Sequence, residues 1–107
     1  MGATEPNATS EYLMATSADS LDLLDAIAAE MVELFSITRG EAVARINAQW
    51  CGIDLSQENE LILHEDGYYW GLSIYFGGEV ADWSPTADRS GWTTRPAPPA
   101  GSKFWTV

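Results

Sequence analysis

HEDGYYWGLSIYF, residues 64–76, is the stretch that decides the fold class of this chain. Asp66-Gly67 is a dipeptide typical of a hairpin turn. After this dipeptide, apolar residues occupy every second position, which is the period of a strand. Helical spacing fits the same residues, but a glycine inside a helix costs about 1 kcal/mol, so Gly71 favours the strand. We therefore predict a strand over 68–76.

Two amphipathic helices are predicted ahead of this strand. Asp19 or Ser20 is a suitable N-cap for a helix over 20–36. Its apolar residues recur at helical spacing: Leu21, Leu24, Ile27, Ala28, Met31, Leu34 and Phe35. Thr38 and Glu41 have the spacing of a capping box and predict a second helix over 39–50.

The remaining segments complete an α+β prediction. Residues 61–64 are predicted as a strand that pairs with 68–76, and residues 79–83 as a third strand. We expect a single α+β domain over residues 18–107, with two N-terminal helices packed on a small antiparallel sheet. An irregular, proline-rich segment follows, and its terminal Phe104 and Trp105 suit either a core or an interface. Residues 1–17 are predicted to be a flexible N-terminal arm, which Tyr12, Leu13 and Met14 could hold against the body.

The charge balance is the most unusual property of the composition. The 107 residues include 5 basic and 16 acidic side chains, for a net charge of −11. Such a field repels nucleic acid and anionic membranes and accelerates association with basic surfaces. The single cysteine, Cys51, excludes an internal disulfide bond, and no signal-peptide pattern or long apolar run occurs. We expect a cytoplasmic protein that binds neither a membrane nor nucleic acid directly.

Residues with catalytic potential are few. His64 and Asp66 could share one face of a strand, but two ligands do not make a catalytic metal site. Cys51 follows the predicted end of a helix, where the negative helix terminus disfavours a thiolate. We expect no enzyme, no cofactor and no metal. A small enzyme that uses His64 and carboxylates remains an alternative.

Carboxylates and aromatic rings occur together in the sequence. One acidic set lies on the predicted outer face of the first helix: Asp22, Asp25 and Glu33. A second set lies beside three aromatic residues, where charge pairing and cation–π contacts could bind Lys and Arg. The partner-binding residues predicted from this second set are Asp54, Glu58, Glu60, Glu65, Asp66, Tyr68, Tyr69 and Trp70. An ordinary solvated surface is the alternative interpretation of both sets.

Two stretches resemble small uncharacterised bacterial domains: ITRGEAVARIN, residues 37–47, and HEDGYYW, residues 64–70. In such relatives a proline often occupies the position of Gly67, as where a helix begins. In size and acidity the chain also resembles the immunity proteins that neutralise polymorphic toxins. The resemblance implies a cytoplasmic binding module that neutralises or regulates a basic protein partner such as a toxin domain. A DNA mimic that inhibits nucleic-acid-binding proteins is the alternative.

Overall fold

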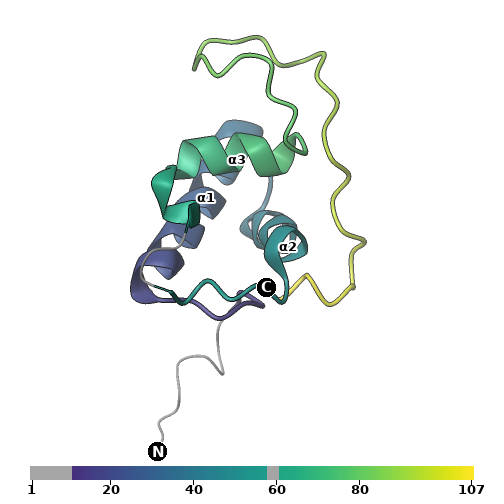
Figure 1. Ribbon diagram of the computed structural model, residues 1–107. Coiled ribbons are helices and arrows are strands. Elements are labelled where there is room, and N and C mark those ends of the chain that lie inside the picture. The colour runs from purple at the N-terminus through teal and green to yellow at the C-terminus, as the bar shows by residue number, and fades with distance from the viewer. Residues whose placement is uncertain (1–10, 58–60) are drawn as a thin grey trace, which may run out of the picture.

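Helices form the body of the protein. The computed structural model describes residues 11–57 and 61–107. Helix α1 spans Ala18–Phe35, α2 spans Arg39–Trp50, the short 3-10 helix η2 spans Leu61–His64, and α3 spans Gly67–Tyr75. Figure 1 shows α3 running along α1, with α2 beside them and a long irregular segment leading from α3 to the C-terminus. The two predicted N-terminal helices are confirmed, each within two residues at either end.

Each of the three α-helices begins at a side chain that accepts a hydrogen bond from its first turn. The Ser17 hydroxyl accepts from the backbone N–H of Ser20 at 3.1 Å, so α1 starts slightly earlier than expected. The Thr38 hydroxyl accepts from the N–H of Glu41 at 3.0 Å, as the capping-box spacing predicts. The Asp66 carboxylate accepts from the N–H of Tyr69 at 2.9 Å and caps α3.

The predicted strand over 68–76 is wrong, because this stretch forms α3. Its two glycines face α1 and let the helices approach closely. A Cβ atom at Gly67 would lie 3.0 Å from the carbonyl carbon and oxygen of Ala26, and one at Gly71 would lie 3.4 Å from Cβ of Glu30. The close packing of two helices thus outweighs the helix penalty of about 1 kcal/mol for a glycine.

The predicted α+β class with an antiparallel sheet is therefore also wrong. Residues 61–64 form η2, and residues 79–83 have no regular structure. Within the described ranges, β pairing is limited to one isolated parallel bridge between Thr16 and Leu55. The fold is helical, and none of the described helices combines the length and apolar character needed to cross a bilayer.

The core lies where the three helices meet. Leu24, Ile27 and Met31 of α1 are fully buried, as are several residues of α2 and α3: Val43, Ile46, Leu72 and Ile74. The N-terminal segment 11–17 also contributes, because Tyr12 and Met14 are buried. The part of the predicted flexible arm that the structure describes is therefore packed on the helices; residues 1–10 lie outside the described ranges.

The side chain of Asn47 ties both ends of the described chain to α2. Asn47 is fully buried. Its Oδ1 accepts from the backbone N–H of Leu13 at 2.8 Å. Its Nδ2 donates to the carbonyl oxygens of Glu11 at 3.1 Å and Phe104 at 3.0 Å. The hydroxyl of Thr106 also donates to the Glu11 carbonyl, so the N- and C-terminal segments lie side by side against this helix.

The irregular segment after α3 is held by a second buried side chain of α2. Figure 1 shows this segment looping beyond the helices and then passing along the outside of α2. Arg45 is buried, and its Nη1 donates to the carbonyl oxygen of Arg95 at 2.7 Å. The guanidinium carbon of Arg45 also lies 4.5 Å from the centre of the Tyr75 ring. The N–H of Arg95 donates to the Tyr75 carbonyl at 2.9 Å. The aromatic residues near the C-terminus, Phe104 and Trp105, are half-buried.

The close α1–α3 contact predicts opposite effects for two glycine substitutions. Gly67→Ala forces a methyl group against the α1 backbone and should lower the free energy of unfolding by about 1–2 kcal/mol. Gly71→Ala meets the side chains of Glu30 and Met31, at 3.4 and 3.6 Å, and backbone only at 3.9 Å. Its gain in helix propensity should leave stability unchanged or higher. Urea titration followed by circular dichroism measures both. A Gly67→Ala variant as stable as the wild type would contradict the packing.

The Asn47 hydrogen bonds predict a large loss of stability on truncation. Asn47→Ala leaves buried backbone groups unpaired and opens a small cavity, so the free energy of unfolding should fall by about 2–3 kcal/mol. Gln49→Ala, which removes one partly exposed hydrogen bond of the same helix, is the matched control and should cost no more than about 1 kcal/mol. Equal losses for the two variants would show that Asn47 is not the main attachment of the termini.

Candidate functional site

The predicted acidic partner-binding residues do not act alike in the structure. Asp54 is exposed, and hydrogen bonds from the hydroxyl and then the backbone N–H of Ser56 lower the pKa of its carboxyl group. Asp66 caps α3, whereas Glu65 is exposed. Glu58 and Glu60 lie outside the described residues. Only Glu65 of the described members is therefore an exposed carboxylate with no structural task.

The predicted aromatic residues are half-buried; two of them attach the irregular segment to α3, and the third binds η2. The Tyr68 hydroxyl donates to the carbonyl of Trp83 at 2.7 Å. Trp70 donates from Nε1 to the carbonyl of Ile62 at 2.8 Å. Tyr69 stacks on Trp83 with ring centres 4.9 Å apart and planes 3° apart. Trp83 is itself 41% exposed, so the Tyr69–Trp83 pair is the aromatic surface that solvent reaches here.

All five basic side chains are engaged within the protein. Arg39 pairs with Glu11 and Asp25, and Arg45 pairs with Glu41 at 2.8 Å. Hydrogen bonds and ring contacts engage the other three. Arg89 donates to the Tyr68 hydroxyl, Arg95 donates to Oε1 of Gln49, and the Nζ of Lys103 lies 5.4 Å from the centre of the Phe104 ring. The four arginines therefore link separate parts of the fold, whereas the exposed Lys103 contacts, among the described residues, only the ring of its neighbour.

Tyr12 and Asp25 belong to the network around Arg39. The Tyr12 hydroxyl donates to Oδ1 of Asp25 at 2.7 Å, and Nη2 of Arg39 donates to the same oxygen at 3.1 Å. Burial, followed by the bond to Asp25, raises the pKa of Tyr12 far above its usual value, which keeps the phenol neutral. The bond to Glu11 raises the pKa of Arg39 further. Asp25, predicted from the sequence as part of an outer acidic face, is thus a structural carboxylate.

Other carboxylates remain without a partner among the described residues, and most of them share one stripe of α1. The members of this stripe are Asp19, Asp22, Glu30 and Glu33. Their spacing of three, eight and three residues places them on one side of a helix. Gly67 contacts Ala26, which lies one turn after Asp22, and Glu65 is two residues before Gly67, so the backbone of Glu65 lies near the same side of α1. We call these five carboxylates the acidic face.

The catalytic alternatives find no assembled site in the described part of the chain. His64 is exposed at the end of η2, and the Asp66 carboxylate is directed to the N–H of Tyr69. Cys51 is half-buried directly after α2, and its N–H donates to the Asn47 carbonyl at 2.8 Å. No described group of three or more His, Cys, Asp or Glu residues is placed to hold a metal ion.

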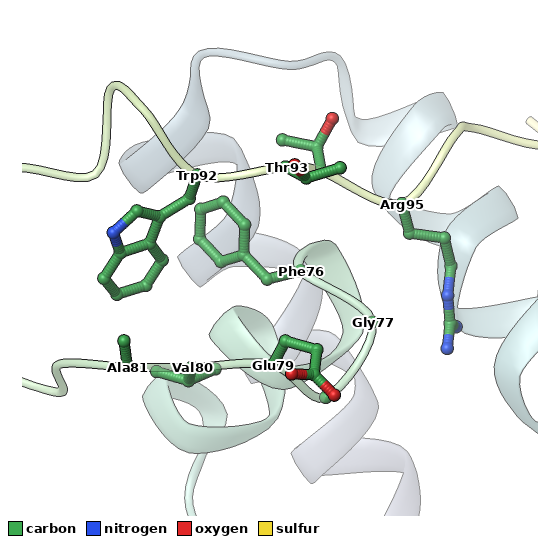
Figure 2. Close-up of a pocket in the computed structure, with 10 residues that line it drawn as sticks. Phe76, Gly77, Glu79, Val80, Ala81, Trp92, Thr93 and Arg95 are labelled. Atoms are coloured by element: carbon green, nitrogen blue, oxygen red, sulfur yellow. The ribbon is translucent and has the colours of Figure 1, made fainter.

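Two hollows flank a pair of aromatic residues in the irregular segment. Phe76 and Trp92 pack edge to face with ring centres 5.0 Å apart. On one side lies a groove of about 670 Å³ between residues 76–81 and 92–95, shown in Figure 2. On the other side lies a smaller hollow of about 350 Å³ that reaches Phe35 and Arg89. We call the larger one the Trp92 groove. Sequence reasoning missed it, because its walls lie in turn-rich stretches that carry no period.

The different tasks of neighbouring carboxylates give a direct test. Asp66→Ala removes the N-cap of α3 and should lower the free energy of unfolding by about 1 kcal/mol. Glu65→Ala removes an exposed carboxylate of the same charge and should change it by less than about 0.5 kcal/mol. Thermal and urea unfolding of the two variants measure the difference. Similar values for both would contradict the capping role of Asp66.

Comparison with known proteins supplies no relative: no family model matches the chain, and no curated protein or solved structure matches it. The resemblance to immunity proteins therefore stays a prediction, and the functional proposal rests on the geometry of the chain itself.

Proposed function

We propose that this protein is an acidic binding module that docks on a basic protein partner and neutralises or regulates it by occlusion, in the manner of an immunity protein. The observation that supports this proposal is the division of charge. Every basic side chain contacts a partner within the protein, two of them (Arg39 and Lys103) at exposed positions, whereas the acidic face carries five carboxylates with no described partner. A surface of this kind is electrostatically complementary to a cluster of Lys and Arg.

The acidic face would act mainly on the rate of encounter. Four of its five carboxylates stand on one helix, where fourteen residues separate Asp19 from Glu33, or about 21 Å along the axis. Steering by such a field raises association rates by about 10- to 1000-fold at low salt. Exposed ion pairs contribute little lasting affinity, because water and salt screen them.

Aromatic side chains would supply the lasting affinity. Trp83 is exposed and lies flat on Tyr69, which follows the Asp66 cap by one turn of α3. A Lys or Arg of the partner placed over such a ring gains about 0.5–2 kcal/mol from the cation–π contact. The Tyr69–Trp83 pair therefore replaces the trio Tyr68, Tyr69 and Trp70 as the proposed aromatic contact.

A DNA mimic is the alternative within the binding modules, and the spacing of the acidic face argues against it. A mimic needs a regular ladder, because each DNA strand carries one charge per 3.4 Å of axis. Between Asp22 and Glu30 the stripe has a gap of eight residues, or about 12 Å. Two short clusters suit a dedicated protein partner better than a phosphate ladder.

Matched charge variants test the proposal. The double variant Asp22→Asn/Glu33→Gln weakens the acidic face. The control, Asp54→Asn/Asp88→Asn, makes the same change of net charge at two exposed turns. The new asparagine side chains can still accept the hydrogen bonds from Ser56 and Ser90. Affinity capture from the source cells identifies partners, and stopped-flow mixing with the purified partner measures the association rate against salt. We expect a basic protein whose association slows with salt and is at least about fivefold slower for the first variant alone.

Three results would contradict the proposal, and a fourth would support the DNA mimic. Equal slowing by both variants would show a general charge effect with no acidic face behind it. A partner without excess basic charge, or an association rate independent of salt, would remove the electrostatic basis altogether. Capture of many nucleic-acid-binding proteins that DNA displaces would support the mimic instead.

A further inference from the structure

The Trp92 groove is built by the chain reversal that follows α3. Gly77 and Gly78 have positive φ angles of 67° and 89°, and the N–H of Gly78 donates to the Ser73 carbonyl at 2.7 Å. This turn sends residues 79–81 along one wall. The opposite wall, residues 92–94, is fixed at its end because the N–H of Arg95 donates to the Tyr75 carbonyl at 2.9 Å. The groove therefore lies between two pieces of chain anchored on the same helix end.

The floor and walls of the groove offer different chemistry. Phe76 and Trp92 form an apolar floor (Figure 2). Arg89, whose guanidinium carbon lies 5.4 Å from the centre of the Trp92 ring, lines only the smaller hollow. Along the walls, four residues make no hydrogen bond to any other described residue: Val80, Ala81, Thr93 and Thr94. Their peptide groups are available to an extended chain laid between them.

Two charged side chains line the groove: the carboxylate of Glu79 and the guanidinium of Arg95, which is bound to Gln49. Glu79 is exposed, lines the groove, and has no described partner. Arg95 closes the other end, where Nη1 donates to Oε1 of Gln49 at 2.7 Å. In Figure 2 the Arg95 side chain extends away from the Phe76–Trp92 floor, beyond Gly77. The Glu79 carboxylate is thus the charged group of the groove with no described partner, whereas Arg95 keeps its charge but is bound to Gln49 at the far end.

We propose that the Trp92 groove binds an extended peptide segment with a lysine side chain, whose aliphatic stem lies on Phe76 and Trp92 and whose ammonium group pairs with Glu79. The volume of about 670 Å³ falls within the range of small-ligand sites. A lysine stem covers apolar surface while its charged end stays in water, as this open groove requires. This inference rests on the proposed function, because it assigns a segment of the basic partner to a second contact apart from the acidic face.

Nuclear magnetic resonance of the full, isotopically labelled chain tests the groove with a defined probe, the peptide acetyl-Thr-Val-Lys-Val-Thr-amide. We expect shifts in the Trp92 indole N–H and in the amides of residues 79–81 and 93–94. Glu79→Gln, and separately norleucine in place of the peptide lysine, should each weaken binding by about two- to fivefold, the range of one exposed ion pair. Asp54→Asn, which changes net charge equally at an exposed turn outside both the groove and the acidic face, should leave the affinity unchanged.

The outcomes separate this inference from the proposed function. No shifts at millimolar peptide, shifts confined to α1, or equal weakening by Asp54→Asn and Glu79→Gln would overturn the groove assignment while the docking proposal stands. Tighter binding of the same peptide with glutamate in place of lysine would also overturn it, because Arg95 would then be the determinant. Groove binding together with a partner insensitive to the acidic face would overturn docking and keep the groove.

Discussion

The buried amide of Asn47 is the interaction on which the arrangement of the chain depends. A side chain with no access to water must find partners for its donors and acceptor inside the protein. Asn47 finds them on the backbone of residues 11–13 and of Phe104, so one α2 residue fixes two segments that are more than 90 residues apart in sequence. Neither segment forms a helix or a strand ladder. Their positions therefore depend on side chains of α2, with Arg45 holding the Arg95 carbonyl in the same way.

This use of Arg45 and the other basic residues explains how the fold and the charge distribution are connected. In a long irregular segment, many backbone carbonyl groups have no partner in a helix or sheet and need hydrogen-bond donors from side chains. The guanidinium group of an arginine supplies several such donors at once. Arg45 and Arg89 both donate to carbonyls of the irregular segment. Basic groups used in this way are withdrawn from the surface, and the carboxylates of α1 are left unbalanced. The acidic face is in this sense a consequence of how the C-terminal segment is held.

The sequence allowed the two N-terminal helices to be predicted, because long apolar periods and the Thr38 cap are local signals. The sequence did not allow the third helix to be predicted, because residues 68–76 fit both the helical and the strand period. The choice between the two depends on what the glycines of this stretch contact in the folded protein. Gly67 and Gly71 face α1 in the structure, and that contact is not visible in one sequence. The proline expected at position 67 from the predicted resemblance pointed to a helix instead, because proline suits the first position of a helix. Of the residues now proposed for partner binding, Glu65 and Tyr69 were also predicted from the sequence, whereas Trp83, Glu79 and Trp92 carry no periodic signal.

The two proposed contacts differ in the stability of the elements that carry them. The acidic face stands mainly on α1, an eighteen-residue helix with a buried side, so its charges are held in fixed positions before any partner arrives. The Tyr69–Trp83 pair and the Trp92 groove involve residues 79–95, where backbone hydrogen bonds are sparse and most side chains are exposed. Segments of this kind open at a lower cost in free energy than packed helices do. Charges that steer an encounter benefit from rigidity, whereas a groove that must close around an extended chain benefits from walls that can move. The division between helix and irregular segment therefore matches the order in which docking would use them.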